Sequence, residues 1–364
     1  MNRGLVLGIV IAVAVAAIVA AILVANPMSS SKHSKVVLRG AGATFPLLQI
    51  EEWIKSFEKS HPDIVITYQG VGSGAGQSQF FAKTVDFCGT DPPLSRDRWL
   101  EYQGKVLQIP YLLGAVVVVY NVPEADGKTL NLSAEVLALI YRGDIVYWDD
   151  PRIAKLNPGL DLPHKEIKVV YRADASGTQQ IFTLYLHKAA PSLWPKEWVS
   201  KTMKSPIVGS GRALGGKGNP GVVQIIKSTP YSIGFVEWSY AIKEHLPIAA
   251  IENARGEFVK PSIESLMEAA KAAAKLLPKD PREDFSKDLE LIVFANASKA
   301  YPLTSWTHLV LWTSYESSKA RALATFLRWI HDEGYKHIVP GYAPPPPEIR
   351  ELLLEAAKIL ESSG

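Results

Sequence analysis

The chain has 364 residues, of which 47% are hydrophobic and 21% charged, a composition typical of a globular protein long enough for two domains. Its 39 basic and 36 acidic residues leave a net charge of +3, and no lysine- or arginine-rich block stands out, which argues against a nucleic-acid partner. The single cysteine, Cys88, excludes an internal disulfide and a zinc site built from several thiolates.

The N-terminus carries an uncharged run, residues 4–25, with the sequence GLVLGIVIAVAVAAIVAAILVA. As a helix this run would span about 33 Å, enough to cross a bilayer. It is longer than the apolar core of a cleavable signal peptide, and the residues after it match a cleavage site poorly. We therefore expect residues 1–35 to be an uncleaved anchor with a serine-rich spacer, and the remaining chain to lie outside the cytoplasm. Cleavage of a signal segment and secretion is the alternative.

From residue 36 onward, strand and helix patterns alternate, which indicates an α/β fold. Strands are expected within residues 36–42, 64–72 and 84–91, with helices at 46–60 and through 80–84. The first helix has apolar side chains at helical spacing, namely Ile50, Trp53, Ile54 and Phe57. Two very apolar strands, around 112–122 and 301–312, are candidates for the places where the chain crosses between domains. An amphipathic helix is expected to begin near Pro347.

Three turns share one design, in which a strand ends in small or hydroxyl-bearing residues that open a helix. They are Ala43-Thr44-Phe45, Ser73-Gly74-Ala75-Gly76 and Ser176-Gly177-Thr178. The first turn of a helix has unpaired N–H groups and a partial positive charge. Hydroxyl groups would add further donors, so the pattern predicts a cradle for an oxyanion. Ordinary helix N-caps use the same residue types, and this alternative stays open.

Two charged residues are candidates for recognising such an anion. Arg172 ends a predicted strand, and its guanidinium could fork onto two oxygens of a phosphate. Asp174 could orient that arginine, or the two could form a purely structural ion pair. The carboxylate of Asp91 only accepts hydrogen bonds, so in an anion cradle it would favour monohydrogen phosphate, which carries a proton, over sulfate. An aspartate before two prolines is also a common turn former.

Catalytic motifs are not recognisable. The histidines form no HExxH pattern and no G-x-S-x-G elbow occurs, so we expect no catalytic residue, no metal and no cofactor. Residues 214–221 lack the spacing of a phosphate-binding P-loop because Gly218 follows Lys217, and we expect this loop to shape the rim of a cleft. Cys88 is expected to be a small core residue.

Six segments in one order resemble the phosphate-binding proteins of high-affinity phosphate ABC transporters. They are GAGATFP (40–46), YQGVGSGAG (68–76), TVDFCGTDPPLS (84–95), YRADASGTQQIFT (171–183), LGGKGNPG (214–221) and IGFVEWSYA (233–241). The resemblance implies a two-domain α/β fold of the periplasmic-binding-protein type, with the ligand cleft between the domains. We expect domain I in residues 36–118 and 300–364, and domain II in residues 119–299. The implied phosphate contacts are Thr44, Phe45, Ser73, Asp91, Arg172, Ser176, Gly177 and Thr178, with Asp174 supporting the arginine.

These observations predict a monomeric binding protein, not an enzyme, that captures inorganic phosphate outside the cell. It would deliver phosphate to an ABC-transporter permease and be held at the membrane by its N-terminal helix. A phosphatase-like enzyme is the alternative from another class, but it would need a nucleophile, a metal or a general base that the sequence does not display. A binding protein for another oxyanion, such as sulfate, is a further alternative, and Asp91 argues against it.

Overall fold

The computed structural model describes residues 35–125 and 127–363. The predicted membrane anchor, residues 4–25, lies outside this described part. Within it, no helix has both the length and the apolar character that crossing a membrane requires.

An eight-stranded sheet runs through the body in the order β2-β1-β3-β11-β4-β8-β6-β7. Strands β1 (Val36–Gly42), β2 (Ile64–Gly70) and β3 (Phe87–Thr90) are parallel, and β11 (Thr304–Trp312) runs antiparallel beside β3. Strand β6 (Lys168–Arg172) lies parallel to and between β8 (Ser232–Glu237) and β7 (Ala213–Gly216).

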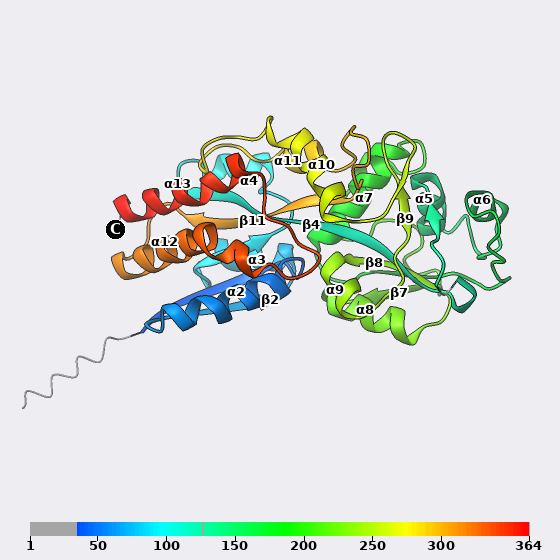
Figure 1. The fold of residues 1–364 in the computed structure, drawn as a ribbon, viewed down its shortest axis with the longest axis horizontal. Coiled ribbons are helices and arrows are strands. Elements are labelled where there is room, and N and C mark those ends of the chain that lie inside the picture. Colours follow the sequence, from blue (N-terminus) through cyan, green and yellow to red (C-terminus); the bar gives the residue numbers. More distant parts are fainter. Residues whose placement is uncertain (1–34, 126, 364) are drawn as a thin grey trace, which may run out of the picture. The chain divides into compact units, whose positions relative to one another are not determined.

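The long strand β4 (Val106–Asn121) joins the two halves of this sheet (Figure 1). Its residues 106–115 pair with β11, and its residues 116–121 pair with β8. All of its residues except the last are buried, which explains why the sequence reads as a continuous apolar run. We call the half with β1, β2, β3 and β11 lobe 1, and the half with β6, β7 and β8 lobe 2.

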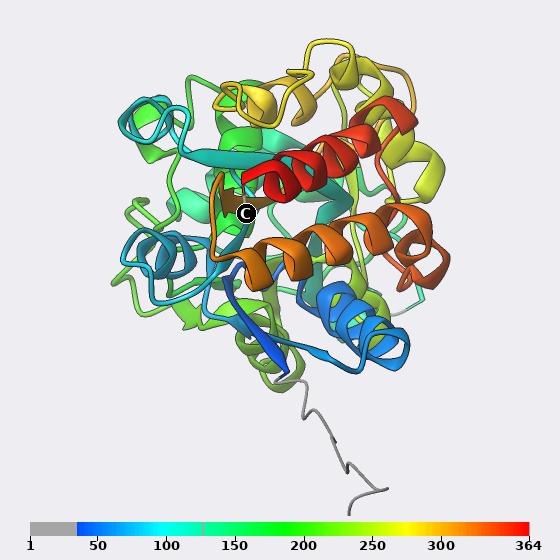
Figure 2. The same ribbon diagram turned by 90° about the vertical axis from the view of Figure 1, so that its left-hand side faces the viewer.

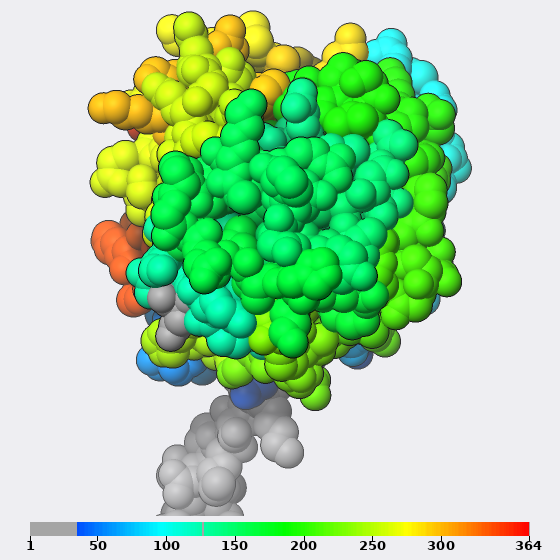
Figure 3. Space-filling view, turned by 90° about the vertical axis from the view of Figure 1, so that its right-hand side faces the viewer, coloured from blue at the N-terminus to red at the C-terminus, as the bar shows by residue number. Residues whose placement is uncertain are grey.

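Helices cover both halves. Lobe 1 contains α2 (Leu47–Ser60), α3 (Ser73–Phe81), α4 (Arg96–Glu101), α12 (Ser317–Asp332) and α13 (Pro347–Ser363), and Figure 2 shows α12 and α13 side by side. Lobe 2 contains α5 (Ala134–Arg142), α6 (Pro151–Leu156), α7 (Gly177–Ala189), α8 (Gly218–Ser228) and α9 (Trp238–Lys243). The green segment that includes α6 and α7 covers most of the face in Figure 3.

The remaining elements are short or lie across the two halves. Helices α10 (Ile263–Ala274) and α11 (Asp288–Ile292) pack against β11. A second sheet has the order β10-β9-β5, with β5 at Asn131–Leu132, β9 at Ala250–Glu252 and β10 at Phe258–Val259. Single 3₁₀ turns occupy Pro123–Ala125, Lys196–Trp198 and Gly334–His337.

The predicted α/β fold is confirmed, with small shifts at element ends. Ile50, Trp53 and Phe57 form the buried stripe of α2, and the Trp53 indole donates to the carbonyl of Gly334 at 2.7 Å. This helix begins at Leu47, one residue later than the sequence suggested. Residues 214–221, expected to be a loop, instead form the end of β7 and the first turn of α8.

Candidate functional site

The first turns of four helices meet between the lobes, and we call this meeting point the cradle. Helices α2 and α3 come from lobe 1, and α7 and α8 come from lobe 2. The backbone N–H of Gly74 donates to the carbonyl of Ala175 at 3.0 Å, so α3 lies against the turn before α7. The backbone N–H and side-chain amide of Asn219 each donate to Thr44 Oγ1 at 3.1 Å, which joins α8 to the turn before α2.

All eight predicted contact residues are buried, and they lie in or next to the chain turns that meet here. Thr44 is 4% exposed, Arg172 2% and Asp91 1%, while the other contact side chains are fully buried. Further links seal the lobes together, since Tyr240 donates to the carbonyl of Thr44 at 2.8 Å and Lys201 to Gln77 at 3.2 Å. The cradle is therefore shielded from solvent in this structure.

Asp91 follows β3 and is the central acidic group of the cradle. Its Oδ1 accepts a hydrogen bond from Thr307 at 3.0 Å, and its Oδ2 accepts one from Ser73 at 3.3 Å. Oδ2 faces α7 of lobe 2 so closely that a β-carbon on Gly177 would lie 2.4 Å from it. Burial raises the pKa of Asp91 to about 7, and the Thr307 hydrogen bond and the charge of Arg172 only partly offset this effect.

Arg172 ends β6, and one side of its guanidinium is paired with Asp174. Its Nε and Nη2 donate to the two carboxylate oxygens of Asp174 at 2.8 and 2.6 Å. Nη1, which reaches Thr178 Oγ1 at 3.3 Å, and the second hydrogen of Nη2 remain for a ligand, so the bidentate contact with phosphate stays a prediction. Burial alone would raise the pKa of Asp174, but the hydrogen bonds and charge of Arg172 outweigh it and lower that pKa.

The hydroxyl groups show that the N-cap and cradle interpretations are compatible. Ser176 is the N-cap of α7, because its Oγ accepts from the backbone N–H of Gln179 at 3.2 Å. Thr44 Oγ1 likewise acts as the acceptor in its bonds from Asn219. A hydroxyl that accepts still carries a proton to donate, so both groups can also turn that proton toward an anion.

Several residues at the cradle were missed by sequence reasoning. They are Asn219, Tyr240, Thr307 and His308. Asn219 lies within the glycine-rich segment 214–221, but no local sequence pattern indicates its contact with Thr44. Thr307 and His308 lie in the middle of the apolar strand β11. Nothing in the sequence of that strand indicates that they contact Asp91.

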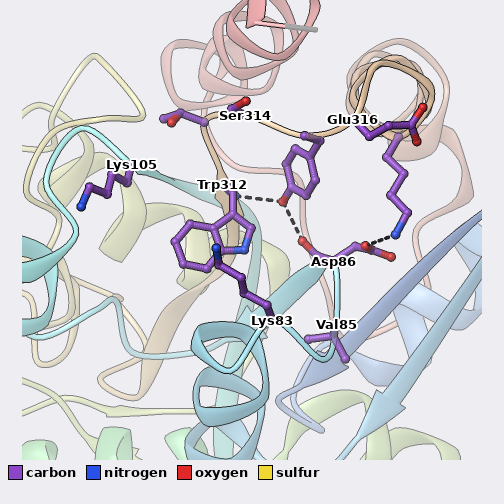
Figure 4. A pocket seen from close by; sticks show the side chains of 10 residues that line it. Lys83, Val85, Asp86, Lys105, Trp312, Ser314 and Glu316 are labelled. Atoms are coloured by element: carbon purple, nitrogen blue, oxygen red, sulfur yellow. Dashed lines mark hydrogen bonds and ion pairs between the residues drawn. The ribbon is translucent and has the colours of Figure 1, made fainter.

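Asp86, five residues before Asp91, has a different setting in a surface pocket (Figure 4). Its carboxylate accepts from Lys319 at 2.6 Å and from the backbone N–H of Arg39 at 2.7 Å, while its carbonyl accepts from Tyr315. These bonds tie β1, β3 and α12 together, so Asp86 is a structural acid. Cys88 between the two acids is buried in the core, as expected, and burial raises the pKa of its thiol.

Comparisons with known proteins place this chain in a class of binding proteins. Residues 29–333 match the family described as the PBP superfamily domain. Solved phosphate-binding proteins share the fold, including one from Stenotrophomonas maltophilia with a TM-score of 0.66, 17% identity, and coverage of 88% of this chain and 93% of that chain. A periplasmic phosphate-binding protein solved with phosphate has a TM-score of 0.65, 20% identity, and coverage of 87% and 92%.

Curated relatives narrow this class. The phosphate-binding protein PstS of Methanocaldococcus jannaschii is 43% identical over 354 residues, which are 93% of this chain and 90% of the relative. PstS of Xylella fastidiosa is 34% identical over 329 residues, covering 89% and 85%. The chain therefore belongs to the PstS family of phosphate-binding proteins. This membership confirms the resemblance seen in the sequence and the expectation of a binding protein rather than an enzyme.

Proposed function

We propose that this chain binds inorganic phosphate on the outer side of the cell membrane and delivers it to the permease of a phosphate ABC transporter. Family membership supports the transport role. The observation that carries the choice of ligand is the buried, acceptor-only carboxylate of Asp91, set among helix N-termini and opposite Arg172. A bound oxyanion that carries a proton can satisfy this carboxylate, whereas sulfate would face it unpaired.

The contact set follows from the geometry of the cradle. In lobe 1, the hydroxyl of Thr44, the N–H of Phe45 and the hydroxyl of Ser73 would donate to phosphate oxygens. In lobe 2, donors would come from Nη1 and Nη2 of Arg172, the hydroxyls of Ser176 and Thr178, and the N–H groups of Gly177 and Thr178. Asp91 Oδ2 would accept the proton of monohydrogen phosphate. Asp174 would hold the Arg172 side chain in place from behind.

Phosphate would enter when the lobes separate and would favour their closure, because its contacts come from both. We place domain I at residues 36–118 and 300–364 and domain II at 119–299, with β4 and the segment leading into β11 as the connections. The change of partner within β4, from β11 to β8, supports this division. Residues 4–25 would anchor the protein to the membrane as an uncleaved helix.

Calorimetric titration of the full-length protein in detergent, stripped of ligand, tests this function. Phosphate should bind tightly with one-to-one stoichiometry, and sulfate should give no heat at a pH well above the Asp91 pKa of about 7. Asp91→Asn should admit sulfate, because an amide can donate to an unprotonated oxygen. Asp86→Asn is the matched control, since it changes the structural acid of the same segment and should keep selectivity. Equal binding of phosphate and sulfate by the natural chain would refute the proposal, and turnover of a phosphate ester would favour the enzyme alternative.

A further inference from the structure

Two consecutive residues of β11 hold Asp91 from different sides. Thr307 Oγ1 donates to Asp91 Oδ1 at 3.0 Å, and the His308 ring nitrogen Nδ1 lies 3.0 Å from the Asp91 carbonyl oxygen. In a regular strand, neighbouring side chains point to opposite faces. Here the register of β11 against β4 slips between Thr307 and His308, and such bulges often re-aim side chains beside functional sites.

The imidazole of His308 is braced from behind by Asp288. The Nε2 atom makes a close hydrogen bond with Asp288 Oδ2, and both side chains are fully buried. Because a carbonyl oxygen only accepts, Nδ1 must carry a hydrogen, and Nε2 then shares a second proton with the Asp288 carboxylate. Burial lowers the pKa of His308, but the charge and hydrogen bond of Asp288 outweigh burial and raise it. The ring therefore places a positive charge beside Asp91.

Stability alone is a weak reason for this pair. Asp288 Oδ1 is buried and has no hydrogen-bond partner within the described residues. A buried ion pair with an unsatisfied oxygen is often no more stable than apolar side chains of similar volume. The His308–Asp288 pair does have a local effect, because it fixes the Asp91 peptide. Thr307 in turn occupies Oδ1 of Asp91 and leaves Oδ2 facing the cradle.

We propose that Thr307 and His308, with Asp288 behind the ring, are positioning residues that hold Asp91 as an ionised acceptor and thereby set the exclusion of unprotonated oxyanions. This inference rests on the proposed phosphate-binding function. Loss of the imidazole would remove a hydrogen bond to the Asp91 peptide and a nearby positive charge. Asp91 would then be protonated at a higher pH, and a protonated carboxyl can donate to sulfate.

Other groups also act on Asp91 and must be separated from His308. Those that interact with it electrostatically are Arg172, Lys201, Glu237, Cys88, Tyr68, Tyr111 and Tyr240. Burial raises the pKa of the thiol and of the phenols, which keeps them neutral. Burial also raises the pKa of Glu237 well above its ordinary value, so a pH dependence of sulfate binding could come from Glu237 instead of Asp91. A variant of Glu237 is therefore needed as a control.

The test measures sulfate affinity of the full-length protein against pH, because sulfate itself does not titrate near neutrality. The natural chain should bind sulfate only as the pH falls through about 7. In His308→Asn the midpoint should move up by about one pH unit, which gives about threefold tighter sulfate binding at pH 7.5 and about ninefold at about pH 9. Asp288→Asn should move it in the same direction. Glu237→Gln should leave the midpoint unchanged, as should His187→Asn, which changes another ring bonded to a backbone carbonyl.

A second pair of variants decides the matter if His308→Asn does not fold. Thr307→Val removes the donor to Oδ1 at nearly constant volume and should also raise the midpoint, while Thr307→Ser should restore it. An unchanged midpoint in Thr307→Val, or in a folded His308→Asn, would overturn this inference while phosphate binding by the natural chain stands. Failure of the natural chain to bind phosphate would instead overturn the proposed function.

Discussion

Gly177→Ala is the substitution that tests lobe closure most directly. Gly177 begins α7 in lobe 2, and an added β-carbon would lie 2.4 Å from Asp91 Oδ2 and 2.6 Å from Pro92 Cδ, both in lobe 1. Ordinary contacts begin near 3.4 Å, so the lobes would have to stay about 1 Å further apart at this point. Hydrogen bonds from lobe 2 to a ligand held by lobe 1 would then exceed the normal length limit.

The cost can be sized from those lost bonds. Hydrogen bonds to a charged group contribute about 1.5 to 3 kcal/mol each. Losing one or two of them gives about 3 kcal/mol, or about a 100-fold weaker phosphate Kd. The substitution keeps the Gly177 N–H and improves helix propensity, so the thermal midpoint of the ligand-free protein should not fall.

Calorimetric titration of phosphate and thermal unfolding without phosphate make the assay. Gly221→Ala is the control, because its β-carbon would approach nothing closer than 3.3 Å and that neighbour belongs to the same lobe. A phosphate Kd for Gly177→Ala within threefold of the natural value would refute the argument that closure against Asp91 forms the site.

Three further outcomes are expected. Arg172→Ala should weaken phosphate binding by about 2 to 4 kcal/mol, because it removes a buried donor and leaves Asp174 unpaired beside the anion. A phosphate Kd close to the natural value, measured by calorimetric titration, would place the arginine outside the site. Tyr240→Phe should weaken phosphate binding about 3- to 10-fold by removing a link between lobes, whereas Tyr141→Phe, whose hydroxyl bonds within lobe 2, should leave the Kd unchanged. The folded pKa of Asp91 is raised to about 7, so between about pH 4 and 7 the native state holds a proton that the unfolded state has lost. The stability of the ligand-free protein should therefore fall as the pH rises through this window. Thermal unfolding of Asp91→Asn should not show this fall.

Much of the cradle is predictable because its parts are local. A helix start such as Ser176-Gly177-Thr178 needs small and hydroxyl-bearing residues for reasons of backbone geometry, and these residues stand together in the sequence. The apolar run of β4 likewise reflects burial along one strand. Both features could therefore be read without knowing which segments meet.

The links between segments could not be read in this way. Asn219 reaches Thr44 across 175 positions, and Thr307 reaches Asp91 across 216, so neither contact leaves a local pattern. Even the short-range pair Arg172 and Asp174 was ambiguous. Its two-residue spacing allowed either an unpaired guanidinium or an ion pair, and only the side-chain geometry shows that Asp174 pairs with the Nε and Nη2 side of Arg172.

Under the proposed function, lobe closure and phosphate selectivity both follow from the burial of Asp91. The contacts of Gly177 with Asp91 mean that the lobes cannot close without removing this carboxylate from water, and that removal is what raises its pKa. A ligand that neutralises Arg172 alone leaves the carboxylate unsatisfied in the closed state. A ligand that also donates a proton to Oδ2 satisfies both groups, so it alone makes closure favourable. Discrimination should therefore arise in the closing step, with sulfate and phosphate meeting the open lobes on nearly equal terms.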